Sequence, residues 1–591
     1  MLVWLVAGFI FFRRYPGNFT QPNFYAEDGS VFGRNIIDHG LLRALGTTFN
    51  GYYIWGLYLL EKIGFVFNYL FFGNQFANLP RSFALTSYLF LGFMATLPLL
   101  LFKKYLRPQL IALIVVLAVF VPMTSYDYAI IGTLGNLKFA FTYLAFLLLV
   151  YRHLMPRDSK KVYLVDIGLL ICAYTNITVY PMMLFALLRY LPRDIRHFRS
   201  TWRTYVRELL TDRTFQSLVG LGILLLPQLY VVKTYGVPEL KGYLDAPFRF
   251  SRTIEIFVAR SYLYSVLFPV NKLLSDGLVV ALAVAVLGGG YWLAGKYRKI
   301  FVFGILTVFL ATFLFVIKRT GISDFYTGYH DGGPDQFFYA QNWIFSFVFS
   351  IVVIAAIDKL KTTRLRTGAY VVLGLIVAIV LVPKAGTYGR TDFMADSVGT
   401  IYAVAKQQCD GRQDSLQISI YPSSELKYTG LSRQRLCTAA VTTYHPQVVR
   451  LGLVPYNNKY LDDLGGHHSF TQTFVSPQDN LDGVGVYFST FLRKVRSPYT
   501  LTLYEKDCTT TVRSVRINTG KIHDNAFDTI TFPVVTGAKD QTYCFRVSTA
   551  RQDRVDPLAV QLSKPDQYPA GQAVINGAPS DQDVVFELHY R

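Results

Sequence analysis

Long runs of apolar residues, separated by short polar or basic segments, occupy the chain up to residue 384. A membrane-spanning helix needs about 20 predominantly apolar residues. We interpret the shorter run at residues 1–12 as a first transmembrane helix. Ten further spans are predicted at about residues 84–102, 108–125, 138–152, 162–173, 176–191, 215–231, 276–294, 299–318, 338–357 and 367–383. The pattern predicts a polytopic α-helical membrane region of about eleven spans.

Two apolar segments differ from ordinary spans. Residues 54–72 carry Glu61 and Lys62 near their centre, which suits a helix lying at the membrane interface. The pair of runs at 162–191 is short, and Asn176 and Pro181 favour a tight hairpin of half-helices there. We therefore treat residues 13–83 as one polar, aromatic outer segment.

Beyond Lys384 the pattern changes to the alternation of apolar and polar residues that is typical of β-strands. Turn signals at 480–483, 524–525 and 576–577 separate the strands at a spacing seen in sandwiches. Residues 471–591 are predicted to form a jelly-roll-like β-sandwich, joined to the membrane region by a mixed α/β segment at 385–470. The expected strands are 416–421, 483–491, 499–504, 529–535, 542–548 and 584–590.

Composition agrees with a membrane protein, because 52% of the residues are hydrophobic and only 16% are charged. Average chains carry about 25% charged residues. A net charge of +20 could indicate a nucleic-acid partner, but the basic residues cluster in short loops between apolar runs and no nucleic-acid motif accompanies them. This distribution follows the positive-inside rule for cytoplasmic loops. Nucleic acid is therefore not expected as a partner.

The basic loops also predict the topology. Counted from a cytoplasmic N-terminus, the loops at 103–107, 152–161, 189–213, 296–299 and 359–366 all fall inside. The same count places the loops at 126–137, 232–275 and 319–337, and everything after residue 384, outside. Two independent patterns, basic loops and cysteines, support this arrangement.

Four cysteines lie in the polar C-terminal third, and four cysteines in one such domain indicate two disulfides and an oxidising compartment. Three connectivities are open. We favour sequential pairing, Cys409 with Cys437 and Cys508 with Cys544. Cys172 lies inside an apolar run and is expected to be a small buried hydrophobe.

An acidic motif, Tyr25-Ala26-Glu27-Asp28, follows the first apolar run. A carboxylate in a partly buried, aromatic-lined site can act as a general base, because desolvation raises the carboxyl pKa towards working pH. The alternative is that Glu27 and Asp28 only favour a helix N-terminus, as acidic residues do in a first turn.

Other candidate residues lie in the outer loops. The loop at 319–337 is unusually polar for a connection in a bundle, and such loops often carry function. The loop at 232–275 is basic although it is predicted to be outside, so its cations could bind a lipid phosphate or only face water and headgroups. The candidates are Arg319, His330, Asp331, Asp335 and Gln336 in the first loop, Lys233 and Arg260 in the second, and Asp127 in the loop at 126–137.

This architecture, with an acidic first outer loop, resembles the GT-C superfamily of integral membrane glycosyltransferases. Tyr25-Ala26-Glu27-Asp28 is similar to the acidic motif of those enzymes, and the C-terminal sandwich resembles the carbohydrate-binding modules attached to some of them. The likeness implies a catalytic membrane domain at 1–384 and a sugar donor carried on polyprenyl phosphate. Asp28 would be the general base of an inverting transfer, and Glu27 would orient the acceptor or share that role.

The resemblance also implies roles for the remaining candidates. Lys233, Arg260, Arg319 or His330 would stabilise the departing phosphate. The acceptor sugar would contact Tyr25, Asp127, Asp331, Asp335 and Gln336. No cofactor is required, although a divalent metal stays possible. The expected partners are a polyprenyl-phosphate sugar, a glycan, lipid or protein acceptor, and the lipid bilayer.

Two alternatives stay open. One is a non-enzymatic polysaccharide export or scaffold protein, although transporters usually carry polar residues within their spans. The other is a ligase or polymerase that uses a lipid-diphosphate donor. Such an enzyme needs more cations around its donor, and the basic loop at 232–275 could supply them. The extracytoplasmic C-terminal domain favours a bacterial plasma membrane as the location.

Overall fold

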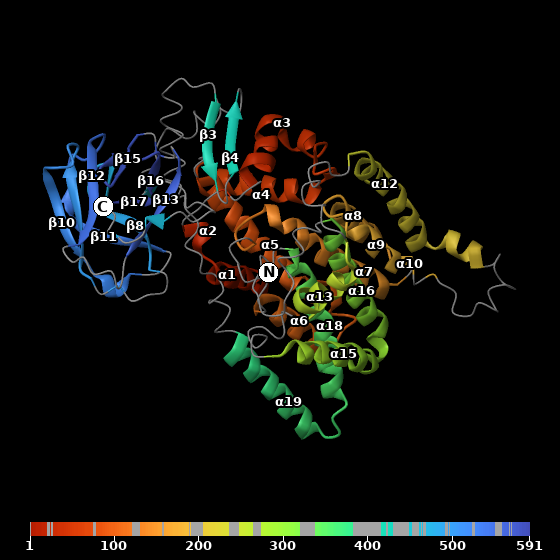
Figure 1. Ribbon diagram of the computed structural model, residues 1–591. Helices are drawn as coiled ribbons and strands as arrows, with labels where there is room; N and C mark the ends of the chain where they lie inside the picture. The colour runs from red at the N-terminus through yellow and green to blue at the C-terminus, as the bar shows by residue number, and fades with distance from the viewer. Residues whose placement is uncertain are drawn as a thin grey trace. The chain divides into compact units, whose positions relative to one another are not determined.

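A computed structural model describes the chain in segments of helix and strand. The described residues are 2–20, 24, 28–74, 78–120, 130–156, 159–187, 190, 205–235, 248–263, 274–318, 337–381, 415–420, 424–429, 448–451, 460–461, 464, 469–490, 495, 497–522, 526–549, 558–565, 568 and 570–591. They form a helical N-terminal region and a C-terminal β domain (Figure 1).

Most longer helices form where the apolar runs predict them, whereas Arg34–Ala44 and Phe250–Ile256 are helical within segments that were predicted to be connections. The longer ones are α1 (Leu2–Arg14), α3 (Arg34–Ala44), α4 (Trp55–Phe71), α5 (Leu79–Phe102), α6 (Pro108–Phe120), α7 (Ala140–Leu154), α8 (Val162–Ala173), α12 (Arg213–Tyr235), α15 (Asp276–Leu293), α16 (Arg298–Lys318), α18 (Tyr339–Asp358) and α19 (Thr363–Ile376). Shorter helical pieces are α2 (Gly17–Thr20), η1 (Asp28–Gly33), η4 (Gly135–Phe139), α9 (Val179–Met182), α10 (Leu184–Leu187), α13 (Phe250–Ile256), η7 (Phe257–Tyr262), η9 (Gly295–Tyr297) and η12 (Val377–Leu381).

Five helical stretches of the described chain are long and apolar enough to cross a membrane. They are Leu79–Phe102, Gly135–Leu154, Arg213–Tyr235, Gly295–Ile317 and Tyr339–Asp358. Three shorter apolar helices, α6, α8 and most of α15, lie between them in the sequence. The chain is therefore a multi-pass membrane protein, while the predicted total of eleven spans goes beyond what these helices establish. The predicted break at Asn176 is present, because α8 ends at Ala173 and α9 begins at Val179, whereas Pro181 lies within α9.

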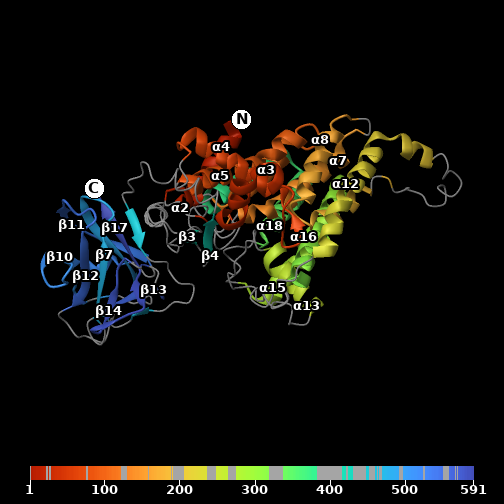
Figure 2. The same cartoon turned by 90° about the horizontal axis from the view of Figure 1, so that it is seen from above.

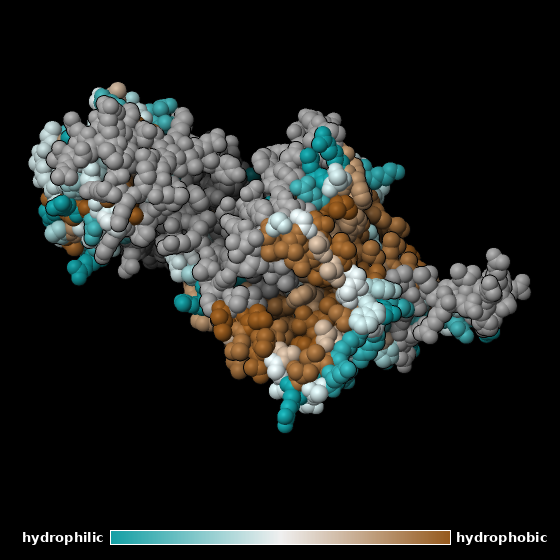
Figure 3. All heavy atoms as spheres, turned by 60° about the horizontal axis from the view of Figure 1, so that its bottom comes forward, coloured by the Kyte–Doolittle hydropathy of each residue, from teal (hydrophilic) through white to brown (hydrophobic). Residues whose placement is uncertain are grey.

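Apolar side chains cover much of the outside of the helical region. On the face drawn in Figure 3 they form a broad brown area with hydrophilic residues along its margin. Ile223, Leu226 and Tyr230 of α12 and Val284 of α15 are each more than half exposed. An exposed apolar surface of this kind is stable in lipid rather than in water.

Contacts between loops show which helix ends lie together. Arg107, after α5, pairs with Asp358 at the end of α18, and the Lys359 ammonium lies 3.2 Å from the ring centre of Trp292 in α15. These contacts gather three of the predicted cytoplasmic loops at one end. At the other end, Tyr339 Oη donates to the Asn136 carbonyl at 3.0 Å, and Asn176 Nδ2 donates to the Lys138 carbonyl at 3.2 Å. The predicted alternation of loops is thus compatible with the packing.

The predicted outer loop at 232–275 is partly wrong. It contains α13 and η7, whose apolar side chains pack onto the bundle. Tyr262 lies 4.6 Å from Phe345 of α18, and Phe257 lies 5.4 Å from Phe309 of α16, between ring centres. Burial of these aromatic rings explains why the segment is helical although its sequence is rich in basic residues.

The C-terminal β domain consists of two antiparallel sheets. In the first, the strand order is β10 (Thr511–Ile517), β9 (Tyr499–Glu505), β12 (Thr542–Thr549), β7 (Phe470–Val475), β14 (Ala573–Ile575) and β15 (Ala578–Pro579). In the second, it is β16 (Gln582–Val584), β13 (Ala559–Pro565), β8 (Leu481–Ser489), β17 (Phe586–Tyr590) and β5 (Val448–Leu451), with β11 (Ala526–Val535) paired to β8 and β6 (Tyr460–Leu461) to β13. Two separate hairpins are β1 (Thr48–Phe49) with β2 (Tyr52–Tyr53), and β3 (Ser415–Ile420) with β4 (Ser424–Thr429).

The core of the β domain lies between the two sheets, which Figure 2 shows from above. Phe586 of β17 lies 5.1 Å from Phe545 of β12 and 5.8 Å from Phe474 of β7, between ring centres. All six predicted strands are present within a few residues. Alternation did not predict the strands β4, β5, β6, β7, β10, β13, β14, β15 and β16. Among these, β7 buries residues on both faces and β10 buries only its last residue. The predicted turn at Asn576-Gly577 joins β14 to β15, with φ positive at both residues.

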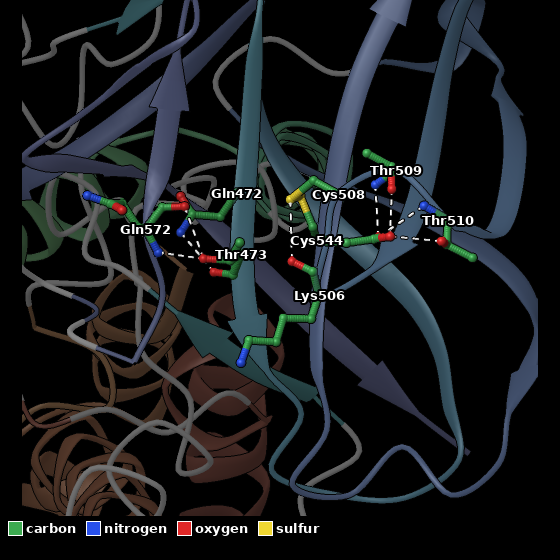
Figure 4. The surroundings of a disulfide bond; sticks show 9 residues. Gln472, Thr473, Lys506, Cys508, Thr509, Thr510, Cys544 and Gln572 are labelled. Carbon is green, nitrogen blue, oxygen red and sulfur yellow. Dashed lines mark hydrogen bonds between the residues drawn. A yellow bond between two sulfur atoms is a disulfide. The ribbon is translucent and has the colours of Figure 1, made fainter.

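A disulfide joins Cys508, in the turn after β9, to Cys544 on β12 (Figure 4). This is one of the two predicted pairings. The other, Cys409 with Cys437, lies outside the described residues. The adjacent Asp507 carboxylate accepts hydrogen bonds from the Thr509 and Thr510 hydroxyls at 2.5 and 2.8 Å, and from both backbone N–H groups at 3.0 Å. Led by the Thr509 hydroxyl, these donors hold the pKa of Asp507 well below its usual range.

By internal packing the chain divides into two compact units. The first comprises Met1–Pro16, His39–Ile63 and Leu85–Arg390; the second comprises Gly17–Asp38, Gly64–Ala84 and Thr391–Arg591. The segment with the acidic motif therefore groups with residues that flank α5 and with the C-terminal part of the sequence. Each unit is considered by itself below.

Candidate functional site

Asp28 is the one residue of the acidic motif that the structure describes. Asp28 is the first residue of η1, which continues directly into α3, and it is only 2% exposed. The position is that of a first helical turn, as the simpler interpretation of the motif requires. A carboxylate that only caps a helix gains nothing from being buried, because burial removes its hydration. Both interpretations of the motif, a helix N-terminus and a general base, therefore stay open.

Aromatic side chains pack around the chain just before the motif. Phe24 packs edge-to-face on Phe83 of α5 with 6.2 Å between ring centres, and Phe83 packs on Phe65 of α4 at 5.8 Å. Phe19 of α2 packs on Phe72 at 6.3 Å. These rings anchor the segment before Asp28 to the first turns of α5. Whether aromatic rings line Asp28 itself stays a prediction.

Arg81 is a cation that the sequence analysis missed. It lies in the first turn of α5, where Nε donates to the Phe19 carbonyl and Nη1 donates to Asn78 Oδ1, both at 3.1 Å. Its guanidinium carbon lies 5.7 Å from the ring centre of Phe19. The side chain is half-buried and belongs to the same compact unit as Asp28. A basic residue at the start of a span, on the side predicted to be outer, was the available signal, since the positive-inside rule disfavours it there.

Glu61 also emerges only from the structure. It belongs to the inward face of α4 with Leu57, Tyr58 and Asn68, and it is completely buried, whereas the adjacent Lys62 is exposed. The sequence analysis took both charges as signs of a helix lying at the membrane interface. The helix directs Glu61 inward and Lys62 outward, because neighbouring positions differ by about 100° around the axis.

The two predicted phosphate-binding cations that are described differ in environment. Lys233 is exposed in the last turn of α12, whereas Arg260 is 1% exposed in η7. The structure does not group them into one site. The other predicted site residues lie outside the described part of the chain: Tyr25, Glu27, Asp127, Arg319, His330, Asp331, Asp335 and Gln336.

A small polar cluster crosses the second sheet of the β domain. His589 Nε2 and Glu587 Oε1 of β17 are 2.8 Å apart, and Thr529 Oγ1 of β11 lies 3.1 Å from the same imidazole nitrogen. They lie across β8 at Gly483 and Gly485. A Cβ at Gly485 would be 2.5 Å from Glu587 Cγ, so a side chain there would displace the carboxylate. The three side chains contact one another, and Glu587 is buried at 4% exposed.

Within the described segments, no group of three or more histidine, cysteine, aspartate or glutamate residues is placed to hold a metal ion. The possibility of a divalent metal stays a prediction.

No protein-family model matches the chain, and no curated protein sequence matches it either.

Proposed function

We propose that this protein is an integral membrane glycosyltransferase that takes a sugar from a polyprenyl-phosphate donor. The acceptor is a glycan, lipid or protein of the cell envelope at the outer face of a bacterial plasma membrane. The observation that carries the proposal is the buried carboxylate of Asp28, held at the head of η1 in a multi-pass membrane protein. The likeness of its surrounding motif to that of the GT-C superfamily supports it.

In the proposed reaction, Asp28 accepts the proton of an acceptor hydroxyl. The hydroxyl oxygen attacks the anomeric carbon of the donor sugar, and the bond from that carbon to the phosphate oxygen breaks. The departing polyprenyl phosphate keeps the electron pair, and the anomeric configuration inverts. Glu27 orients the acceptor. A positioned base of this kind accelerates proton transfer by roughly 10²–10⁴-fold.

Negative charge grows on the leaving phosphate in this step, and cations at its position stabilise the transition state. Arg81 is added to the predicted set of Lys233, Arg260, Arg319 and His330, because its guanidinium is half-buried in the compact unit that contains Asp28. The planar guanidinium suits a phosphate, which it can bind through two parallel hydrogen bonds.

The β domain is proposed to bind the acceptor glycan, as a jelly-roll-like carbohydrate-binding module would. Its two antiparallel sheets and the cluster of Thr529, Glu587 and His589 support this assignment. The disulfide supports an extracytoplasmic location, because disulfides persist in oxidising compartments.

The first test is sugar transfer by the full-length protein in liposomes, with a panel of polyprenyl-phosphate sugars. Asp28→Asn is expected to lower turnover by roughly 10²–10⁴-fold while donor binding is retained. Asp38→Asn is the matched control, because Asp38 is a partly exposed carboxylate of the following helix, 3.4 Å from the Arg34 guanidinium. Its turnover should equal that of wild type.

Full turnover in Asp28→Asn would reject Asp28 as the base and direct attention to Asp331 and Asp335. Glu27→Gln separates the two acidic residues, since it should raise the acceptor KM more than it lowers kcat. A wild-type protein that transfers no sugar from any donor would contradict the proposal. The export or scaffold alternative, or a lipid-diphosphate ligase, would then be preferred.

A further inference from the structure

One face of α18 carries a stripe of polar side chains inside the helical unit. Helical geometry of about 100° per residue brings the five positions within an arc of about 100°. The stripe runs along about 16 Å of helix, at a rise of about 1.5 Å per residue. Its members are Tyr339, Asn342, Trp343, Ser346 and Ser350. All five are buried.

Aromatic rings from two other helices close over this stripe. The ring centre of Trp343 lies 5.0 Å from that of Tyr143 in α7 and 6.4 Å from that of Phe11 in α1. Tyr143 and Asn342 have no exposed surface, and Ser346 and Trp343 are at most 2% exposed. The stripe therefore faces neither lipid nor bulk water.

The two ends of the stripe are satisfied by protein groups. Tyr339 Oη donates to the Asn136 carbonyl at 3.0 Å, and Ser350 Oγ donates to the Ser346 carbonyl at 2.8 Å. The middle is different. Within the described chain, five buried atoms there have no hydrogen-bond partner: Asn342 Nδ2, Asn342 Oδ1, Trp343 Nε1, Ser346 Oγ and Tyr143 Oη.

Such a group of atoms is unstable if it stays dry. Each buried polar atom without a partner carries the full cost of lost hydration, and a partly satisfied network is worse than an apolar core. In a membrane, polar side chains that face the interior of a bundle commonly mark a ligand or ion pathway. An occupant that forms hydrogen bonds with these atoms would remove this cost.

The chemistry of the five atoms selects the occupant. Asn342 Nδ2 and Trp343 Nε1 can only donate, Asn342 Oδ1 can only accept, and the two hydroxyls can do either. An anion would face the amide oxygen, and a cation would face the amide and indole N–H groups. A neutral hydroxyl both donates and accepts, so it satisfies all of them. We propose that Asn342, Trp343, Ser346 and Tyr143 form a buried binding site for neutral hydroxyl groups, supplied by water or by a sugar.

The site is tested by radiolytic footprinting of the full-length protein, in which radicals from internally bound water oxidise adjacent side chains. Tyr143 and Trp343 are expected to gain oxygen although they are buried. Tyr262 is the control, because it is equally buried, packs on the other side of α18 against Phe345, and donates its hydroxyl to the Ala283 carbonyl at 3.3 Å. It should stay unlabelled.

Absence of label on Tyr143 and Trp343 in the wild-type protein would overturn the site without reference to any variant. The double variant Asn342→Leu with Ser346→Ala should abolish the labelling of both rings and leave other positions unchanged. Tyr143→Phe removes one hydroxyl with little change of volume, and it should reduce the labelling of Trp343. Labelling of Trp343 that is unaffected by either variant would place the water elsewhere and reject the site.

Addition of a polyprenyl-phosphate-linked sugar distinguishes the two sources of hydroxyl groups. Protection of Trp343 by the donor would mean that sugar hydroxyls replace the water, and unchanged labelling would mean that water alone occupies the site. Both results support a hydroxyl site. The site does not rest on the proposed sugar transfer, since the footprint of the protein without donor is independent of any activity.

Discussion

Arg152 shows how far one residue can differ from its sequence context. It stands in a row of basic residues that the positive-inside rule assigns to a cytoplasmic loop. In the structure it is 2% exposed, and its Nε donates to Asp166 Oδ1 of α8 at 2.9 Å. Its Nη2 donates to the Thr214 carbonyl and to Ser217 Oγ of α12, so the guanidinium links three helices.

Loss of either Arg152 or Asp166 should lower the stability of the protein. Arg152→Ala leaves the Asp166 carboxylate buried without its cation, and we expect the free energy of unfolding in detergent to fall by about 3–5 kcal/mol. Replacement of both residues, Arg152→Met with Asp166→Leu, should restore most of the stability, because two apolar side chains then fill the site. Equal losses in the single and double variants would show that the ion pair itself is not the source of the stability.

The two buried acidic residues Asp28 and Glu61 differ in how visible they were in the sequence. Glu61 and Asp28 are both buried, yet only Asp28 lies in a motif that pointed to function. The sequence did not predict the burial of Glu61, because it does not reveal which of the adjacent charges Glu61 and Lys62 faces inward.

At the scale of elements, α1 and α5 approach each other through glycine. A Cβ at Gly92 would lie 2.5 Å from the Gly8 backbone nitrogen and 2.8 Å from Gly8 Cα. Trp4 of α1 spans the same contact, with its Nε1 donating to the Leu89 carbonyl at 2.6 Å. Small residues allow helix backbones to pack this closely in membranes. The 13-residue α1 therefore docks on a neighbouring span.

Gly92→Ala should push the two helices apart, because the new methyl group meets backbone atoms that cannot rotate away. We expect a loss of roughly 1–3 kcal/mol in the free energy of unfolding. The matched control is Gly220→Ala in α12, where a Cβ has nothing within 4 Å. That variant should be neutral or more stable, since alanine is the better helix former. A Gly92→Ala protein as stable as wild type would contradict the close contact.

At the scale of the whole molecule, the membrane region and the β domain rely on different sources of stability. Exposed apolar helices require lipid, whereas the β domain has its own core between two sheets and a disulfide that closes 36 residues of chain. A cross-link over a loop of this length stabilises a folded domain by about 3–4 kcal/mol in the chain-entropy model.

The double variant Cys508→Ser with Cys544→Ser should accordingly weaken the β domain alone. We expect proteolysis of the β domain in the full-length protein to begin at a lower denaturant concentration, with the helical region cleaved as in wild type. Reduction of the wild-type protein should give the same shift. A β domain whose protease resistance is unchanged by reduction would show that the cross-link contributes little to its stability.

Much of this architecture was readable from the sequence. The apolar runs predict the helices α5, α6, α7, α8, α12, α15, α16, α18 and α19 and the break after α8, and alternation with turn residues predicts six strands and the Asn576-Gly577 hairpin. The acidic motif also singled out Asp28, whose role in a site stays a prediction. These features depend on residues a few positions apart, so they can be predicted from the sequence alone.

Tertiary structure decided which polar groups are buried. Arg152, Arg260 and Glu61 are charged residues that sequence patterns place at interfaces or in loops, and packing encloses all three. The polar stripe of α18 likewise lies within a run that hydropathy describes only as a membrane span. Burial is set by residues from distant parts of the chain that meet only after folding. The sequence therefore determined the elements and their order, whereas only the packing of helix on helix determined where hydration is lost and a site can form.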